Sequence, residues 1–493
     1  YKMRINTKKL NEKLLTFTYP QEIKSINSET FYIKNIIYSG EIRNVYNIFY
    51  ENIKEFFIND GKVFILELNF NENLNFSEQG YKLIVKENKI LVEYKNEIGL
   101  IYALMKLNNI IKINKSLFEF EIIDYPRLSE RRILLDIGRK YFTKDWILNL
   151  ISEMSKLKLN TLMLHFSENR GFRIESEFDP SIVSKDGFLT KKDIREIIDY
   201  AKNKNISIIP SLDTPGHVEH ILKIHPELGQ IDINGKNSKY SFDITRKSVL
   251  EYIKNLYLEF MELFNNSKYF HIGFDEYMDF KSEQFKNKYQ KILEENSKIN
   301  GFSSWTDSIN LYLNEISKLM IENNFIPRIW NDCLHYGENT SNIFSNKLEN
   351  RIGVDYWCNI PWDDNVVNIS YLLDKGYNEI YNSNSSFFYY VLREEMPKDG
   401  RKQNSWDYFN QYQRIYNIWS PGVFFGENID NEDKRIKGAS ISIWCDNQNL
   451  VSQDIIFEDI KKELRAFAAK TWNYKINENI DIEKYFENLR IIE

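Results

Sequence analysis

The chain has 493 residues, of which 42% are hydrophobic and 28% charged, with a formal net charge of −6 at pH 7. This length predicts two domains, and the residue balance is typical of a folded protein rather than a disordered one. The small negative charge argues against a nucleic-acid surface, which needs a basic excess or stripe. No stretch approaches the roughly 18 consecutive apolar residues of a membrane helix. We therefore expect neither nucleic acid nor a membrane among its partners.

The start of the chain carries no apolar signal core. If Met3 is the native initiator, we expect a cytoplasmic protein; a secreted protein trimmed of its signal peptide would look the same. Cys333, Cys358 and Cys445 show no metal-type spacing and need not pair, which favours a reducing compartment. The oligomeric state stays open.

Residues 1–125 are predicted to form a small α+β domain. Residues 62–70 (KVFILELNF) fit a strand, and residues 81–94 (YKLIVKENKILVEY) fit a hairpin. Residues 96–111 (NEIGLIYALMKLNNII) follow as an amphipathic helix. Strands followed by a helix across one sheet face are typical of this class.

Residues 126–493 alternate between short apolar runs and helical stretches, the last helix being predicted over residues 455–472. Eight runs fit buried parallel strands: 132–137, 160–165, 206–211, 269–273, 326–330, 352–357, 378–382 and 439–444. Eight strands, each followed by a helix, is the count that closes a barrel. The predicted fold class is therefore α/β, a (β/α)8 barrel preceded by the small α+β domain. A doubly wound open sheet is the alternative, although it rarely repeats this unit eight times.

Polar and aromatic side chains gather where the predicted strands end, the edge from which barrel enzymes draw their reacting groups. The first four strands end at or lead into Asp136 with Arg139, HFSEN (165–169), SLDTPGH (211–217) and HIGFDE (271–276). Three later strands end at Trp330, Trp357 and Trp444. A sugar ring stacks its C–H face on indole while its hydroxyls need polar partners. The pattern therefore predicts a sugar pocket, with core packing at the barrel top as the alternative for the tryptophans.

Six motifs follow one another from the first predicted strand to the last: RRILLDIGRKYF, KLKLNTLMLHFSENRGFRIES, IIPSLDTPGH, HIGFDE, RIWND and SISIW. In this order and spacing they resemble glycoside hydrolase family 20, the β-N-acetylhexosaminidases. EQGYKLIV with NEIGLIYALMKL is similar to the end of that family's small N-terminal domain, so the resemblance covers nearly the whole chain. It implies a retaining exo-glycosidase that hydrolyses terminal β-linked N-acetylhexosamine on an oligosaccharide or glycan, with no metal and no cofactor.

The resemblance also implies a mechanism in which the substrate's own 2-acetamido oxygen attacks the anomeric carbon and forms an oxazolinium ion. Glu276 then matches the general acid/base beside the glycosidic oxygen, and Asp275 matches the acceptor of the acetamido N–H. Tyr390 matches the tyrosine that donates to the acetamido oxygen, with Tyr389 as a rival one residue away. For the Asp-Glu dipeptide alone, a solvated pair at a loop start is the alternative.

Further residues carry over as substrate-binding positions. Arg139 matches the arginine that holds hydroxyls on the non-reducing side of the sugar, although a surface arginine is the alternative. Asp213 and His217, together with Glu168, match residues that brace the catalytic pair; a structural histidine explains His217 alone equally well. The remaining predicted pocket residues are Trp330, Trp357, Trp444 and Asp446.

Three departures from the family pattern leave the exact substrate open. Leu392 followed by Arg393 stands where many members place an acid two residues after the tyrosine. Trp444-Cys445-Asp446 is one methylene shorter than the common Trp-x-Glu, and HFSEN replaces His-x-x-Asp-Asp. A lacto-N-biosidase that releases a disaccharide, or an enzyme for 6-substituted N-acetylglucosamine whose anionic group meets Arg393, therefore stays an alternative. RIWND and YYV lean towards the dispersin-like branch, which acts on poly-N-acetylglucosamine.

Two interpretations from other classes remain. A catalytically inactive carbohydrate-binding protein would keep the aromatic pocket without the catalytic set. A metal hydrolase using His217 and His220 lacks a convincing third ligand. The three cysteines are expected as thiols near the pocket rim, where small buried fillers are the favoured interpretation.

Overall fold

The computed structural model describes residues 14, 18–332, 334, 351–359, 366–392 and 411–492. The chain divides into two compact units, the first comprising Tyr1–Ser129, Tyr412–Ser420 and Leu464–Glu493, and the second Glu130–Gln411 and Pro421–Glu463. This division differs from the predicted one because two C-terminal segments group with the N-terminal unit. None of the helices in the described part of the chain is long and apolar enough to cross a membrane.

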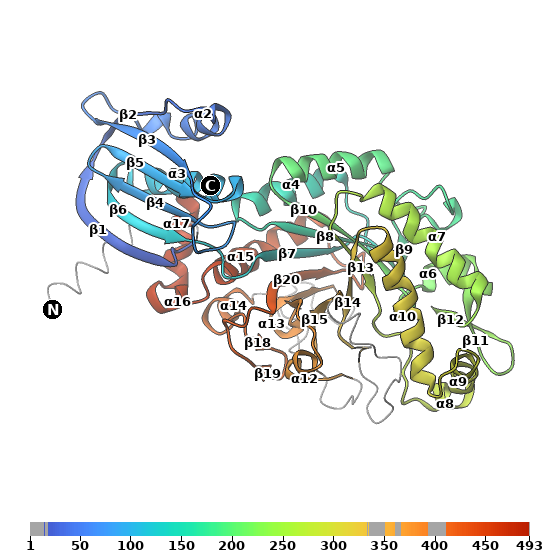
Figure 1. Cartoon of the computed structure of the whole chain (residues 1–493). Coiled ribbons are helices and arrows are strands. Elements are labelled where there is room, and N and C mark those ends of the chain that lie inside the picture. The colour runs from blue at the N-terminus through green and yellow to red at the C-terminus, as the bar shows by residue number, and fades with distance from the viewer. Residues whose placement is uncertain are drawn as a thin grey trace. The chain divides into compact units, whose positions relative to one another are not determined.

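The first unit is built on a six-stranded mixed sheet (Figure 1). Its strands, in spatial order, are β1 (Glu22–Phe31), β6 (Leu117–Asp124), β4 (Tyr81–Lys86), β5 (Lys89–Tyr94), β3 (Lys62–Phe70) and β2 (Ile33–Ile37). Alternate residues of β4 and β5 are buried, as expected for strands with one face on the core. Helix α3 (Glu97–Asn114) begins at Asn96, whose side chain accepts a hydrogen bond from the Ile98 N–H and so caps the helix. Helix α2 (Arg43–Glu51) lies beside β2, an edge strand of the sheet (Figure 1).

Trp472 explains why the C-terminal segment belongs to this unit. Its ring lies edge-on to Tyr102 at 5.3 Å, and its indole N–H donates to Asp124 at 2.8 Å. It is fully buried in the core of the sheet unit. The helices at this end of the chain are α14 (Tyr412–Asn417), α15 (Gln453–Trp472), α16 (Ile476–Asn479) and α17 (Ile482–Ile492).

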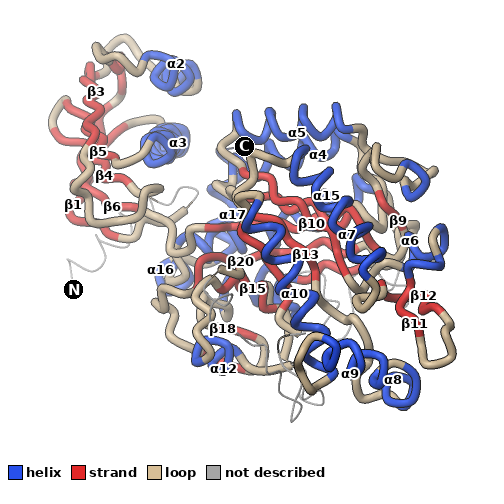
Figure 2. Tube along the Cα trace, turned by 45° about the vertical axis from the view of Figure 1, so that its right-hand side comes forward, coloured by secondary structure: helices blue, strands red, loops and turns tan. Residues whose placement is uncertain are grey.

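The second unit is a closed barrel of eight parallel strands surrounded by helices (Figure 2). The strands are β7 (Glu130–Asp136), β8 (Thr161–Glu168), β10 (Ser207–Thr214), β13 (Tyr269–Gly273), β14 (Ile326–Trp330), β15 (Gly353–Tyr356), β16 (Ile380–Asn382) and β20 (Ile436–Trp444). Pairing of β20 with β7 and of β8 with β10 closes the ring. The predicted (β/α)8 barrel is therefore confirmed, and every predicted strand overlaps an observed one.

The main helices of this unit are α4 (Lys144–Lys156), α5 (Lys191–Asn203), α7 (Lys247–Leu263), α10 (Trp305–Glu322) and the first part of α15. Shorter elements are α6 (Glu219–Ile224), α8 (Glu283–Lys288), α9 (Gln290–Ile299), α12 (Ile369–Asp374), α13 (Ser385–Phe388), β9 (Gly171–Phe172), β11 (Gly229–Ile231), β12 (Asn237–Phe242), β17 (Tyr389–Val391), β18 (Val423–Phe424) and β19 (Glu427–Asn428). Three 3-10 turns cover Lys54–Phe56, Pro180–Ile182 and Pro226–Leu228.

A network of buried ion pairs, which we call the base network, lies towards the amino ends of the strands. Arg328 donates to both carboxylate oxygens of Glu130, at 2.7 and 2.5 Å. Arg132 pairs with Glu130 at 3.1 Å and makes a short ion pair with Asp355. Although burial alone raises the pKa of Glu130, Arg328 and Arg132 lower it below its usual range. The network thus joins two arginines and two carboxyl groups in buried ion pairs.

A hydrophobic layer formed by Leu134, Met163, Ile209 and Trp330 fills the barrel interior. Trp357 and Trp444 pack against this layer. Because the eight barrel strands are parallel, the polar residues that follow them emerge around one opening of the barrel.

Candidate active site

A pocket opens at the carboxyl ends of the barrel strands and has a volume of about 180 Å³. This is below the roughly 300–1,000 Å³ typical of sites for drug-sized ligands and suits a single sugar ring. The pocket is lined by Arg139, Glu168, Asp213, His217, Asp275, Glu276, Trp330, Trp357, Tyr389, Val391, Trp444 and Asp446.

The turn after β13 presents the adjacent carboxylates Asp275 and Glu276. Gly273, Phe274 and Glu276 all have positive φ, at 73°, 73° and 42°. Gly273 also permits a close approach, because a Cβ there would lie 1.6 Å from Asp213 Oδ1. The Asp275 side chain is 15% exposed, whereas that of Glu276 is 60% exposed. The turn therefore seats Asp275 in the pocket wall and leaves Glu276 open at its mouth.

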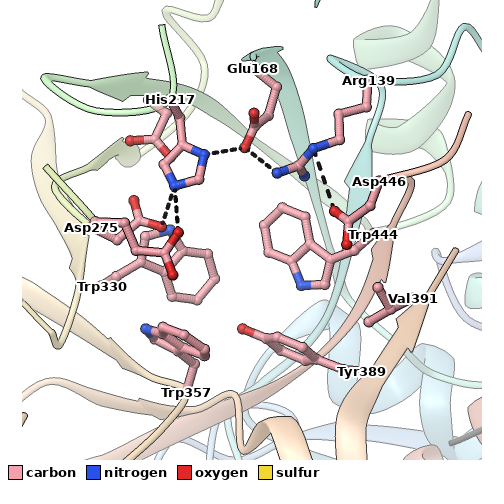
Figure 3. Close-up of a pocket in the computed structure, with 12 residues that line it drawn as sticks. Arg139, Glu168, His217, Asp275, Trp330, Trp357, Tyr389, Val391, Trp444 and Asp446 are labelled. Atoms are coloured by element: carbon pink, nitrogen blue, oxygen red, sulfur yellow. Dashed lines mark ion pairs between the residues drawn. The ribbon is translucent and has the colours of Figure 1, made fainter. Parts of the chain in front are cut away.

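His217 lies between the carboxylates of the mouth (Figure 3). Its Nδ1 is 2.7 Å from Glu168 Oε1, and its Nε2 is 3.4 Å from Asp275 Oδ2 and 3.2 Å from Glu276 Oε2. Burial lowers the pKa of His217, but Glu168 and Asp275 outweigh burial and raise it well above the usual range. A protonated imidazole therefore lies within ion-pair distance of Glu168, Asp275 and Glu276.

Asp213 and Asp275 take different protonation states. Burial and the neighbouring charge of Asp275 raise the pKa of Asp213 well above its usual range. For Asp275, burial raises the pKa, but His217 and a hydrogen bond with Asp213 together bring it below its usual value. Asp213 thus keeps its proton while Asp275 is an ionised acceptor beside the pocket, because two adjoining carboxyls with one cation separate their pKa values.

Arg139 occupies the opposite end of the charged side of the pocket. Its guanidinium pairs with Asp136 at 2.8 Å, Glu168 at 2.7 Å and Asp446 at 3.5 Å. Asp136 and Glu168 are almost fully buried, whereas Asp446 is 34% exposed. The arginine is thus fixed from behind, and the longer pair with Asp446 faces the pocket.

Aromatic rings form the other side of the pocket (Figure 3). Trp357 and Tyr389 are parallel, with ring centroids 6.1 Å apart and planes 4° apart. Trp444 meets Tyr389 at 5.9 Å and Trp330 at 6.0 Å, and Trp330 is only 1% exposed. Exposed ring faces opposite carboxylates are the surfaces that bind the two sides of a sugar.

The assignment of Tyr390 to the pocket is wrong. Tyr389 lines the pocket, whereas the Tyr390 hydroxyl donates to Asp459 at 3.1 Å. The two residues are neighbours on strand β17, where successive side chains point to opposite faces. The position two residues after the pocket tyrosine is therefore Val391, which lines the pocket, and not Leu392, which is fully buried.

The other predicted site residues lie around this one pocket: Asp275, Glu276, Arg139, Asp213, His217, Trp330, Trp357, Trp444 and Asp446. Sequence reasoning missed Val391 and also Asp332, which contacts both the Glu276 backbone and the Trp357 indole. The signal for Asp332 was present, because it is the final residue of the RIWND motif at the end of β14. Val391 was missed because the position two residues after the tyrosine was counted from Tyr390 and not from Tyr389.

Two groups of side chains, His165–Glu168–Asp213 and Asp213–His217–Asp275, have ligand-type atoms within 4.8 Å of one another. His220 lies elsewhere, with Nε2 2.7 Å from the Ile182 carbonyl oxygen. Cys358 and Cys445 are buried, while Arg393 and Cys333 lie outside the described residues.

Residues 129–474 match the catalytic domain of glycosyl hydrolase family 20. The chain belongs to glycosyl hydrolase family 20. It is 25% identical over 417 residues to a lacto-N-biosidase of Bifidobacterium bifidum, an alignment that covers 84% of this chain and 34% of that protein. It is also 25% identical over 391 residues to beta-hexosaminidase subunit A2 of Dictyostelium discoideum, covering 74% of this chain and 67% of that one. The chain thus spans about a third of the length of the first relative.

Solved structures of family 20 members share the fold. An exo β-N-acetylglucosaminidase of Vibrio harveyi, in complex with N-acetylglucosamine, superposes with a TM-score of 0.70 at 19% identity, covering 97% of this chain and 76% of that chain. A β-N-acetylhexosaminidase of Streptomyces coelicolor gives a TM-score of 0.70 at 15% identity and covers 97% of both chains. At this identity the superpositions establish the fold.

Proposed function

We propose that this protein is a retaining exo-glycosidase that removes terminal β-linked N-acetylhexosamine by substrate-assisted catalysis. One observation carries the proposal: the ionised Asp275 and the exposed Glu276 stand side by side at the mouth of an aromatic pocket, braced by a protonated His217. Membership in family 20 supports it, because members of that family take the nucleophile from the substrate.

In the first half-reaction the 2-acetamido carbonyl oxygen attacks the anomeric carbon while Glu276 donates a proton to the departing glycosidic oxygen. Asp275 accepts the acetamido N–H and stabilises the positive charge that develops on the oxazolinium ion. Tyr389, opposite Asp275, donates to the acetamido oxygen. In the second half-reaction Glu276 takes a proton from water, which opens the oxazolinium ring with net retention.

The hydroxyl edge of the sugar meets Arg139 and Asp446. Asp446 offers a partly exposed carboxylate there, while Val391 gives the same side an apolar lining. A pocket with one acid and one valine on this edge leaves room for a substituent. This favours a second candidate, release of a disaccharide, since one relative is a lacto-N-biosidase. A carbohydrate-binding protein without activity would not need the ionised Asp275 beside an open Glu276.

The proposed function is tested with nitrophenyl glycosides of β-GlcNAc, β-GalNAc, β-glucose and lacto-N-biose, with each product identified. We expect hydrolysis only where a 2-acetamido group is present and strong inhibition by a thiazoline that resembles the cyclised intermediate. Asp275→Asn should lower kcat more than it changes KM, because Asp275 acts on the acetamido group as it becomes the nucleophile. Comparable cleavage of the β-glucoside would rule out the substrate-assisted mechanism.

A further inference from the structure

Asp332 joins two parts of the pocket that come from different strands. It follows β14 by two residues and is 9% exposed. Its Oδ2 accepts a hydrogen bond from the Glu276 backbone N–H at 3.0 Å, and its Oδ1 accepts one from the Trp357 indole N–H at 3.0 Å. One carboxyl group therefore connects the turn that carries the general acid to a ring of the aromatic wall.

The contact falls where Glu276 needs support. Glu276 has φ 42°, a left-handed conformation that L residues rarely adopt without help from their surroundings. Its side chain is 60% exposed, so the backbone hydrogen bond to Asp332 fixes the base from which the side chain extends. An acid that protonates a leaving group must be placed closely, and an error of 1 Å lowers rates by about 100-fold.

We propose that Asp332 is a positioning residue that holds Glu276 at a fixed spacing from Trp357, and so aligns the acid with the glycosidic oxygen of a sugar stacked on that wall. The inference rests on the proposed function and adds a residue to it. Burial and the charges of Asp275 and Glu276 raise the pKa of Asp332 to about 8. Near neutral pH the carboxyl group therefore supports its neighbours without placing a further full negative charge beside Asp275.

The adjacent Asn331 offers a matched control. Its Oδ1 accepts the Trp357 backbone N–H at 2.9 Å, and its Nδ2 donates to the Cys358 carbonyl at 2.9 Å. Asn331 thus ties the same two strand ends together through Trp357, but its hydrogen bonds go to the Trp357 side of the pocket. Asn331→Ser loosens the wall, whereas Asp332→Asn removes one of two acceptor oxygens from the bridge itself.

The experiment compares wild type, Asp332→Asn and Asn331→Ser on nitrophenyl β-GlcNAc and on chitobiose. Nitrophenol departs without protonation, whereas the sugar alcohol of chitobiose needs the acid. We expect Asp332→Asn to lose roughly 10- to 100-fold more kcat on chitobiose than on the nitrophenyl substrate. Asn331→Ser should lose similar amounts on both, and thiazoline binding should persist in each variant because the sugar pocket is kept.

Equal losses of Asp332→Asn on the two substrates, or a rise in KM with unchanged kcat, would overturn the positioning role. If Asp332→Asn does not fold, Trp357→Phe removes the indole N–H that donates to Asp332. This variant should also lose more kcat on chitobiose than on the nitrophenyl substrate, and equal losses would overturn the inference. Wild-type enzyme that cleaves neither substrate would overturn the proposed function and this inference with it. If the wild type is active but Asp332→Asn shows no larger loss on chitobiose than on the nitrophenyl substrate, the positioning role of Asp332 is overturned and the proposed function stands.

Discussion

The two ends of the barrel interior both bury charged groups, but they balance them differently. In the base network, Arg132 and Arg328 pair with Glu130 and Asp355, and the ion-pair distances are 3.1 Å or shorter. At the mouth, His217 and Arg139 face a larger set of carboxyl groups: Asp136, Glu168, Asp213, Asp275, Glu276, Asp332 and Asp446. Two of these, Asp213 and Asp332, have pKa values raised by burial and by their neighbours.

The difference shows what each end is built for. Buried ions that are fully paired hold the strand ends together, since removing either partner leaves an uncompensated charge. A surplus of carboxyl groups around an open pocket destabilises the free protein but complements positive charge that develops in a bound sugar. Substitutions at the base should therefore change stability, and substitutions at the mouth should change rate.

The largest effect on rate is expected at the mouth, from Glu276→Gln. Loss of the proton donor should lower kcat on an oligosaccharide by roughly 10²–10⁴-fold, the usual contribution of general acid–base catalysis. The loss should be smaller on a nitrophenyl substrate. Because the side chain is 60% exposed, the free energy of unfolding should change little, as measured by urea titration. A large loss of stability would contradict the assignment of this end to catalysis.

The base network should give the reverse result. Glu130→Gln leaves Arg328 and Arg132 without their shared carboxylate, and breaking a buried pair in this way costs about 3–5 kcal/mol. The measurement is the free energy of unfolding from denaturant titration, with kcat normalised to folded protein. Glu322→Gln removes an exposed partner of Lys318 as a control and should stay within about 0.5 kcal/mol. If Glu130→Gln kept normal stability but lost kcat, the assignment of the base network to stability would be contradicted.

The sequence predicted the barrel and most of the site because both leave local signals. Eight apolar runs of strand length mark the strands, and HIGFDE places Asp275 and Glu276 directly after one of them. The base network left no such signal: Glu130 and Arg328 are far apart in the chain and meet only because the barrel closes. Tyr389 and Tyr390 could not be separated either, since both occupy a three-residue strand whose facing is set by pairing with β20.

Substitutions of the adjacent residues Tyr389 and Tyr390 should have smaller effects, one on kcat and the other on stability. Tyr389→Phe should lower kcat by about 10- to 100-fold, the range of 1.5–3 kcal/mol for a hydrogen bond to a charged group, with a smaller change in KM. Tyr390→Phe removes the hydrogen bond to Asp459 and should lower stability by about 1 kcal/mol with kcat retained. Steady-state kinetics and thermal unfolding of both variants decide the assignment. Loss of kcat in Tyr390→Phe alone would restore the sequence-based assignment.

The last prediction concerns a cost in stability at the mouth of the pocket, which should appear as a dependence of the free energy of unfolding on pH. The pKa of Asp332 is about 8 in the folded protein against an ordinary value of 3.8. Between these values the folded chain holds a proton that the unfolded chain has released, so stability falls as pH rises, by up to about 1.4 kcal/mol per pH unit. Asn at this position cannot titrate. The difference in free energy of unfolding, Asp332→Asn minus wild type, should therefore increase steadily from pH 5 to pH 8, while Asn331→Ser shows no such trend. Asp213 and His217 titrate in all three proteins and largely cancel in the differences. A difference that stays constant over this range would mean that Asp332 is ionised near neutral pH. Ionising this carboxyl group at the mouth would then cost the folded protein no stability, and the contrast with the base network would fail at this residue.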